Sequence, residues 1–401
     1  MTGHGSIIRN GAGRRPRGRL AVAVGIAVII ALVVSATLLL QALRDDAVAV
    51  TATGWPGPSG VEVVDEQGQL GHDVSGLSVQ TADDGSETLW AVRNAPGLVH
   101  RFAPDGEGWY PTDDTWGAGK QLRDTNGEGR PDAEALVFVE NAGGDALYVA
   151  IERDNHIPDV SSLRVLRYSL FEGPIAAVDA EAPGGDPEGD GLRGEGDAAA
   201  SSAGSAEELV ATHDWDLSAE FPRTEPNEGF EGIAYVPDDA LVSGRFLDES
   251  RGKRYDPDDY GSHGSGVFFV GMETTGMIYG YVLEDNGDFT RVSTIDSGLP
   301  ALAELEYEPD TGRLWAICDD TCAGTSTSLE LTSRWFWSRS RFSVAERYDR
   351  PAGMPDTNNE GFAISRDSSC ADGVKPVYWS DDNALDGHVL RAGRVTCGST
   401  R

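Results

Sequence analysis

The sequence predicts an all-β fold, a β-propeller of five blades, preceded by one N-terminal transmembrane helix. Composition is the first observation: 50 glycines and 20 prolines among 401 residues are typical of a turn-rich, mostly β chain. The second is a phrase that occurs twice, as NEGFEGIAY at residues 227–235 and as NNEGFAIS at residues 358–365. The third is that variants of this phrase recur along the chain at nearly regular intervals, as expected for repeated blades.

An apolar segment near the N-terminus predicts a membrane anchor. Residues 20–40 carry no charge, and at about 1.5 Å per residue they can cross a hydrocarbon layer of roughly 30 Å. Five arginines precede the segment and two aspartates follow it, so the positive-inside rule places the N-terminus in the cytoplasm. We therefore expect a single-pass protein of the cell membrane, with a basic cytoplasmic segment at 1–19, a signal anchor at 20–43, a linker at 44–60 and an external propeller at 61–397.

A cleaved signal peptide is the alternative to an anchor. Residues 47–49, Ala-Val-Ala, have the small-x-small form that signal peptidase accepts, and cleavage would give a secreted protein. In both cases the propeller lies outside the cytoplasm, where cysteines can oxidise. Four cysteines allow three pairings, and the simplest joins sequence neighbours, Cys318 with Cys322 and Cys370 with Cys397.

The chain after Arg44 is strongly acidic. It holds 26 basic and 66 acidic residues, a formal charge of −40. Such a surface repels nucleic acid and anionic lipid, so we expect no nucleic-acid partner and no membrane contact other than the N-terminal helix. The acidic residues either form a solvated surface or include carboxylates that hold a hard cation such as calcium.

Residues 172–208 differ from the rest of the chain in composition. They read EGPIAAVDAEAPGGDPEGDGLRGEGDAAASSAGSAEE and contain almost no large apolar side chain. Such a segment buries too little surface to offset its ordering entropy. We expect a disordered acidic loop that interrupts one domain.

Five short phrases define the blades, because each is followed by an aromatic strand such as LWAVRNA or GVFFVGMETTG. The phrases lie at Ser75, Glu134, Glu231, Glu304 and Glu360, and their intervals are 59, 97, 73 and 56 residues. Without the 37-residue acidic loop the interval of 97 becomes 60, and an insertion around 241–265 accounts for the interval of 73. The strand VEVVDE at 61–66 can complete the short last unit by ring closure. A sixth, degenerate unit stays open.

A propeller brings the first strand of every blade to a central channel. Glu134, Glu231, Glu304 and Glu360 would then form a ring of carboxylates, with Ser75 in the fifth place. Gathered carboxylates repel one another and need protons, water, basic partners or a cation. These four glutamates therefore either form a cation site or hydrogen-bond turn amides and neighbouring blades.

Further oxygen side chains follow the second strands of the last two blades. Asp319 and Asp320 belong to CDDT, and Asp381, Asp382 and Asn383 belong to SDDN, so we expect these side chains at a blade rim near the mouth of the channel. Oxygen-only ligands favour calcium or magnesium over zinc. The segment DTNGEGRPDAE at 124–134 also resembles a calcium loop, but Ala135 occupies its twelfth position. An ordinary glycine-rich turn is the alternative there.

The phrases EGIAYVPDD at 231–239 and NEGFAIS at 359–365 resemble those of the "esterase-like activity of phytase" domain family and related phytase-like propellers. The resemblance spans roughly residues 61–397 and implies hydrolysis of phosphate or other esters with calcium. In such an enzyme Glu231 and Glu360 are the candidate catalytic carboxylates. A lactonase version resembles gluconolactonase-type propellers, with which Glu360, Asp381 and Asn383 on one ion are compatible.

Arg93 in AVRN and Arg153 in IERDN occupy the same place in successive second strands. They are the candidate catalytic arginines, because phosphate capture needs basic groups as well as metal. The acidic charge of the outer part would repel a phytate-like polyanion unless metal reversed the field. This repulsion counts against a phytase.

The sequence lacks G-x-S-x-G, H-E-x-x-H, P-loop and C-x-x-C motifs, which argues against a serine triad and several other known chemistries. Three function classes stay open. The first is a calcium-dependent hydrolase of phosphoesters, esters or lactones, in which the cation lowers the pKa of a bound water. The second is a non-catalytic envelope module that binds a protein or glycan, and the third is a structural ectodomain stabilised by calcium. We expect a monomeric propeller. Repeats establish the fold better than the function, so they do not identify its small-molecule or envelope partner.

Overall fold

The computed structural model describes residues 50–82, 84–106, 108–140, 144–170, 207–333 and 338–398. A division between Val50 and Thr51 separates the propeller from the residues before it. The predicted segments 1–19 and 20–43, and all but the end of the predicted acidic loop, lie outside the described residues. Within the described ranges, no helix is both long and apolar enough to span a membrane.

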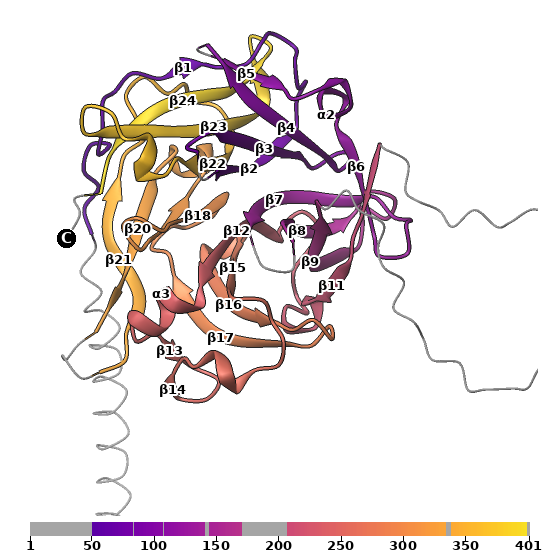
Figure 1. Cartoon of the computed structure of the whole chain (residues 1–401), viewed down its shortest axis with the longest axis vertical. Helices are drawn as coiled ribbons and strands as arrows, with labels where there is room; N and C mark the ends of the chain where they lie inside the picture. Colours follow the sequence, from indigo (N-terminus) through magenta and orange to yellow (C-terminus); the bar gives the residue numbers. More distant parts are fainter. Residues whose placement is uncertain are drawn as a thin grey trace, which may run out of the picture. The chain divides into compact units, whose positions relative to one another are not determined.

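Five antiparallel sheets surround a common centre, which confirms the predicted five-blade propeller (Figure 1). The first strand of each sheet lies nearest the centre. Neighbouring inner strands pack against each other all the way round the ring, so the described residues leave no place for a sixth blade. The inner strands are β2 (Val74–Thr81), β7 (Pro131–Val139), β12 (Phe230–Pro237), β18 (Glu304–Glu308) and β22 (Asn359–Ile364).

Each inner strand is followed by strands that lead outward in antiparallel order. The first blade continues with β3 (Glu87–Arg93), β4 (Leu98–Asp105), β5 (Gly108–Pro111), helix α2 (Asp114–Ala118) and β6 (Lys120–Arg123). The second blade continues with β8 (Ala146–Asp154), β9 (Ser161–Ser169), β11 (His213–Asp216) and turn η1 (Ser218–Glu220). The third blade continues with β15 (Gly266–Met272), turn η3 (Glu273–Thr275), β16 (Met277–Leu283) and β17 (Phe289–Asp296). The fourth continues with β19 (Arg313–Ile317), turn η4 (Asp320–Cys322), β20 (Ser326–Thr332) and β21 (Arg341–Tyr348), and the fifth with turn η5 (Asp367–Ser369), β23 (Val374–Leu385) and β24 (His388–Thr396).

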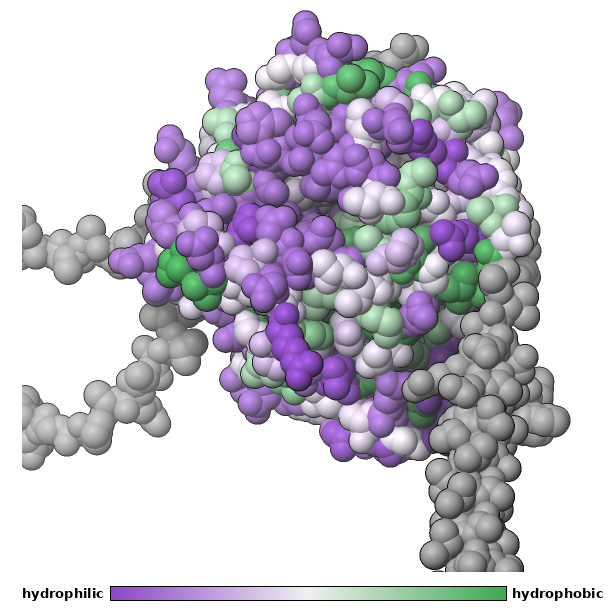
Figure 2. All heavy atoms as spheres, turned by 180° about the vertical axis from the view of Figure 1, so that it is seen from behind, coloured by the Kyte–Doolittle hydropathy of each residue, from purple (hydrophilic) through white to green (hydrophobic). Residues whose placement is uncertain are grey.

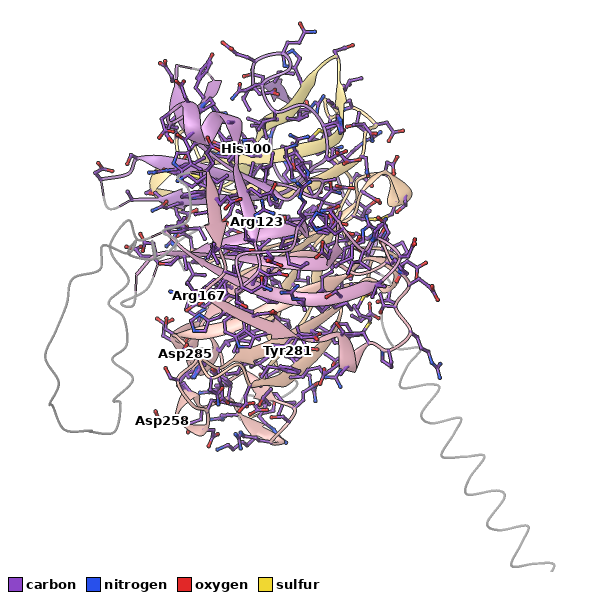
Figure 3. All side chains as sticks on the ribbon, turned by 90° about the vertical axis from the view of Figure 1, so that its right-hand side faces the viewer. His100, Arg123, Arg167, Asp258, Tyr281 and Asp285 are labelled. Carbon is purple, nitrogen blue, oxygen red and sulfur yellow. A yellow bond between two sulfur atoms is a disulfide. The ribbon has the colours of Figure 1, made fainter. Side chains whose placement is uncertain are left out.

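The chain that returns after the acidic segment is tied to the first two blades. Strand β10 (Glu208–Val210) pairs in parallel with β6, so Glu208, predicted as the end of the loop, belongs to a strand. The guanidinium of Arg123 lies 2.8 Å from the Glu208 carboxylate, and Nη1 of Arg167 donates to Oγ1 of Thr212 at 2.9 Å. Figure 3 views this edge of the molecule, with Arg123 and Arg167 labelled.

An N-terminal strand closes the ring, as the sequence predicts. Strand β1 (Glu62–Val63) pairs antiparallel with β24 and supplies the outer strand of the fifth blade. The ordered contacts begin earlier than expected, because Thr53 bridges to Tyr348 and the indole N–H of Trp55 donates to the carbonyl of Arg394 at 2.8 Å. The expectation that 44–60 is all linker is therefore wrong for residues 51–60, which pack on the propeller.

Apolar side chains fill each of the five interfaces between neighbouring blades. The core consists of five clusters, one for each interface. Aromatic side chains supply most of the buried area of such sheet-on-sheet packing. Representative fully buried members are Trp90, Trp215, Phe269, Trp315 and Phe102.

The predicted insertion in the third blade lies between β12 and β15. It contains helix α3 (Asp238–Ser243), a hairpin of β13 (Leu247–Asp248) and β14 (Lys253–Arg254), and turn η2 (Pro257–Asp259). The cysteines form the simplest predicted pairing, Cys318 with Cys322 and Cys370 with Cys397. Hydrophilic side chains dominate the face of the propeller shown in Figure 2, with smaller hydrophobic patches among them.

Candidate metal centre in the central channel

Four of the five predicted channel positions sit on β-bulges at the start of the inner strands. Strand pairing shifts register at Ser75 in β2, at Glu134 in β7, at Glu231 in β12 and between Asn359 and Phe362 in β22, which includes Glu360. A bulge inserts one extra residue and re-aims its side chain. The four positions are therefore equivalent in backbone structure as well as in sequence.

The glycine after three of these positions explains the repeated Glu-Gly phrase. A Cβ atom on Gly76 would lie 2.7 Å from the Cα of Ala135, and one on Gly232 would lie 2.7 Å from the nitrogen of Leu305. A Cβ on Gly361 would lie 2.1 Å from Oγ of Ser380. Only glycine tolerates such approaches. The phrase thus combines a bulged residue with a glycine that lets neighbouring strands come close.

Glu304 differs from the other predicted ring members. It pairs in register with Ile317 and has no bulge. Its Oε1 accepts backbone N–H groups from Leu305 at 2.9 Å and from Ile233 of the adjacent blade at 3.3 Å. Burial raises the pKa of Glu304 well above its ordinary value, and backbone hydrogen bonds, including one from Leu77, lower it again in part. This carboxyl therefore bridges two inner strands through backbone hydrogen bonds.

Three buried carboxylates, one of them that of Glu134, lie close together in the channel. Asp132, Glu134 and Glu152 each place one oxygen within 4.8 Å of the other two, and their exposed fractions are 0%, 3% and 1%. Arg153 forms an ion pair with Asp132 and lies 3.5 Å from Glu152. Oδ1 of Asp132 is buried without a hydrogen-bond partner. Glu134 and Arg153 are predicted from the sequence, whereas Asp132 and Glu152 are found only in the structure.

The bulged glutamates influence one another electrostatically across the channel. Burial raises the pKa of Glu134 well above its ordinary value, and Glu152, Asp132 and Glu360 raise it further. The pKa of Glu231 is also raised well above the usual range, first by burial and then by Glu134 and Glu360. These carboxyls either hold protons at neutral pH or need a cation to offset their charge.

The pKa values of Glu360 and Glu152 lie near neutral pH. Burial and the nearby Asp382 raise the pKa of Glu360 to about 8, although Ser75 and Asn358 lower it in part. The amide of Asn358 donates to Oε1 of Glu360 at 2.7 Å, whereas Oε2 is buried without a hydrogen bond. Burial raises the pKa of Glu152 to about 7, despite the opposing effect of Arg153.

The other predicted ligands are held by different partners. Asp381 is fully buried and lies 3.2 Å from Nη1 of Arg391, and Asn383 is exposed while its backbone N–H donates to Asp381 at 3.0 Å. Of the candidates in SDDN, Asp382 is the one that raises the pKa of Glu360. Arg93 donates through Nε to the carbonyl of His72 at 2.8 Å.

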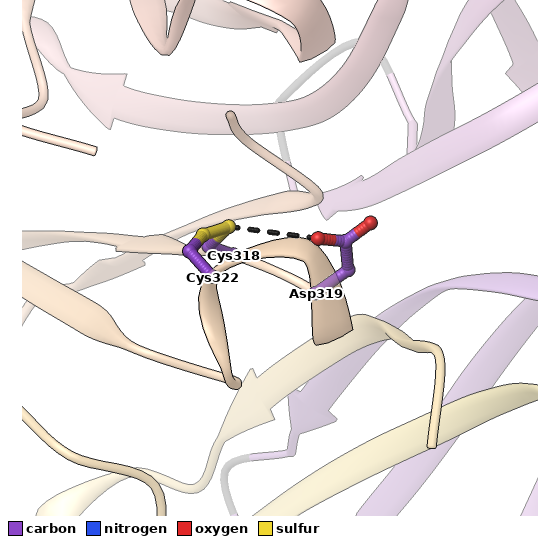
Figure 4. Close-up of side chains that lie close together, drawn as sticks. All are labelled: Cys318, Asp319 and Cys322. Carbon is purple, nitrogen blue, oxygen red and sulfur yellow. Dashed lines mark hydrogen bonds between the residues drawn. A yellow bond between two sulfur atoms is a disulfide. The ribbon is translucent and has the colours of Figure 1, made fainter. Parts of the chain in front are cut away.

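Asp319 lies beside the disulfide of the fourth blade (Figure 4). Its Oδ1 accepts the backbone N–H of Thr321 at 2.9 Å, and it lies 3.5 Å from Sγ of Cys318. Because Cys318 and Cys322 are joined, their sulfurs are not thiolate ligands. Asp319 is nevertheless near enough to raise the pKa of Glu360.

The predicted calcium-like loop forms an ordinary turn. The carboxylate of Asp124 lies 2.9 Å from Arg164, and Oδ1 of Asn126 accepts the backbone N–H of Glu128 at 2.8 Å. These contacts use the side-chain oxygens that a calcium loop would direct at its ion. The channel group is thus the better cation candidate, since it offers only oxygen atoms and includes buried ones without hydrogen bonds.

No protein-family model and no curated protein matches the sequence. Solved structures with some similarity include a functionally unknown protein from Desulfotomaculum acetoxidans, at TM-score 0.35 and 10% identity over 83% of this chain and 74% of that one. An Aleuria aurantia lectin in complex with Fucα1-6GlcNAc gives TM-score 0.36 and 10% identity over 77% and 73%. A nidogen/laminin complex gives 0.32 and 9% over 78% and 73%. The five-blade assignment rests on the sheets of this chain and not on these likenesses.

Proposed function

We propose that this chain is an extracytoplasmic, membrane-tethered hydrolase that depends on calcium and acts on esters, lactones or phosphoesters. The supporting observation is the group of three buried carboxylates, Asp132, Glu134 and Glu152, whose oxygens lie within 4.8 Å of one another. Glu231 and Glu360 adjoin this group, as their mutual effects on pKa indicate. Five carboxyls gathered in the channel, most of them buried, are costly without protons or a cation.

In this proposal Asp132, Glu134 and Glu152 hold the cation, with Glu231 completing the site. Calcium, when bound, would polarise a substrate oxygen and favour deprotonation of water. Arg153 positions the Asp132 carboxylate through their ion pair. Glu360 supplies or accepts a proton, because its pKa of about 8 lies near neutral pH. Asn358 orients Glu360 through the hydrogen bond to Oε1.

The sequence adds support to the hydrolase and to its location. The phrases at 231–239 and 359–365 resemble the phytase-related esterase-like family, and the apolar residues 20–43 suit a membrane anchor. Asp381 and Asn383 are left out of the proposed site because Arg391 and local backbone contacts engage them. Arg93 stays a candidate for substrate contact at the rim.

Calcium titration of the purified full-length chain tests the proposal. After chelation, stoichiometric heat release and a rise in melting temperature are expected, since a ligand of the folded state stabilises that state. Glu231→Gln and Glu360→Gln should abolish ester or lactone hydrolysis, and Glu231→Gln should also abolish the calcium-induced rise. Glu304→Gln is the matched control and should keep both. Absence of calcium binding by the unaltered chain would refute the proposal.

A calcium-stabilised binding module is the second candidate. It is favoured by the engagement of both candidate arginines, Arg153 by two carboxylates and Arg93 by the His72 carbonyl. These contacts reduce the basic groups available for phosphate. Calcium binding without turnover of any phosphoester, ester or lactone would select this candidate over the hydrolase.

A further inference from the structure

The central channel has a second mouth at the carboxyl ends of the inner strands. A cavity of about 210 Å³ opens there, and all five blades contribute to its lining through residues such as Gln80, Phe138, Tyr235, Glu306 and Ile364. The bulged carboxylates lie at the opposite, amino-terminal ends of these strands. This far-mouth cavity is therefore separate from the candidate metal centre.

Glu306 is the acidic group that opens to this cavity from the strand wall. Alternation along β18 puts Glu304, Glu306 and Glu308 on one face. Glu304 and Glu308 are buried, with exposed fractions of 0% and 4%, whereas Glu306 is partly exposed and lines the cavity. Of the three carboxyls on this face, only that of Glu306 lines the cavity at the second mouth.

The ammonium group of the nearby Lys375 is already paired with two other carboxylates. Nζ of Lys375 lies 2.7 Å from Oε1 of Glu308 and 2.7 Å from Oδ1 of Asp367. Glu308 also accepts the indole N–H of Trp315 at 3.0 Å. Glu306 has no ion-pair partner in the described part of the chain. Burial raises its pKa to about 8, and a backbone hydrogen bond from Ile364 lowers the pKa in part. Its carboxylate therefore lacks a close counter-ion.

The walls of the cavity are aromatic and aliphatic. Phe138 stacks on Trp90 with ring centroids 6.1 Å apart, and Tyr235 packs on Phe268 at 5.1 Å, so both rings are held in place. At the rim, Arg366 donates to the two oxygens of Asp310 at 3.1 and 3.3 Å. Because Asp310 offsets this guanidinium, the deprotonated form of Glu306 gives the cavity an uncompensated negative charge.

We propose that the far-mouth cavity binds a small organic ammonium ion. The ammonium group would pair with Glu306, because a desolvated carboxylate without a partner is costly. The apolar part would pack on Phe138 and Tyr235, and the ring faces would also attract the ammonium group. Pockets for drug-sized ligands measure roughly 300–1,000 Å³, so a cavity of about 210 Å³ suits an amine of a few carbons. The acidic surface would raise the local concentration of such cations.

Ligand-observed NMR with the full-length chain tests this site. We expect n-butylammonium to bind and the uncharged n-butanol, of similar shape, to bind at least about tenfold more weakly. Glu306→Gln should weaken n-butylammonium binding by a similar factor, with Glu140→Gln as the control at the cavity rim. Glu231→Gln should leave it unchanged, which separates this site from the channel carboxylates.

Three results would overturn the proposal. The first is equal binding of butanol and butylammonium, which would make the site merely apolar. The second is unchanged butylammonium binding in Glu306→Gln. The third is no saturable binding of butylammonium, or its displacement at equal concentration by potassium, which would show that the cavity does not recognise an organic ammonium ion.

Discussion

Asp381 and Arg391 form a buried ion pair that joins β23 to β24, with Oδ2 and Nη1 3.2 Å apart. Their side chains are 0% and 4% exposed. Removal of one partner leaves a buried charge uncompensated and costs about 3–5 kcal/mol. We therefore expect Asp381→Asn to lower the free energy of unfolding by about this amount, as measured by urea denaturation of metal-free protein.

The same variant distinguishes a structural aspartate from a metal ligand. The double variant Asp381→Asn/Arg391→Met should recover part of the lost stability, because it removes both charges. The calcium-induced rise in melting temperature should persist in both. Normal stability combined with loss of the calcium effect would instead return Asp381 to the metal site.

A local phrase determines the backbone at two of the predicted channel positions. The Glu-Gly phrase places Glu231 and Glu360 on bulges, because the glycine permits the close approach of the next strand. The phrase at Glu304 lacks this glycine, and Glu304 itself takes the place of the glycine in the register with β19. Without the pairing partner, a shift of one residue is not visible in the sequence.

The residues that were missed depend on strand register. Asp132 precedes two register shifts in β7, and a bulge breaks the alternation from which its side-chain direction would be inferred. Asp381 and Asp382 are adjacent in one strand and therefore face opposite sides. The sequence alone does not say which of the two faces Glu360, and the ion pair with Arg391 decides it.

We predict that protonation of the buried His100 lowers the stability of the protein in acid. Burial lowers its pKa to about 4, with a further contribution from Arg93, and its Nε2 has no hydrogen-bond partner. The unfolded chain binds this proton near pH 6.5, so the contribution of neutral His100 is complete above pH 6.5 and is lost as the pH falls towards 4. The loss is about 3 kcal/mol at most.

Comparison of His100→Gln with the unaltered chain measures this contribution. Glutamine does not titrate, so the difference in unfolding free energy between the two proteins should change in favour of the variant from pH 7 to pH 4.5. Urea denaturation at both pH values gives the difference. A constant difference would mean that His100 does not cause the acid sensitivity.

We predict that the fully buried ammonium group of Lys375 stabilises the fold. Its side chain is 0% exposed and contacts Glu308 and Asp367 at 2.7 Å. Lys375→Met should cost about 3 kcal/mol or more, because Glu308 is left buried without its counter-ion. Lys253→Met is the matched control: Lys253 pairs with Asp259 at the surface and is 49% exposed, so its loss should cost less than about 1 kcal/mol. Similar losses in both variants would contradict the assignment.

From the contacts of Trp55, we predict that the segment before β1 is part of the folded domain. Its ring lies against Trp379 and Trp315, with centroids 5.4 and 6.1 Å apart, and its indole donates to the carbonyl of Arg394. Full loss of a core tryptophan costs about 3–5 kcal/mol, and the partial exposure of Trp55 places Trp55→Ala at or below the lower end of that range. Val63→Ala, at a side chain that is 48% exposed, should change stability by no more than about 0.5 kcal/mol. Chemical denaturation of both variants decides the point. If Trp55→Ala unfolds at the same denaturant concentration as the unaltered chain, residues 51–60 are part of the predicted linker, and ring closure depends on β1 alone.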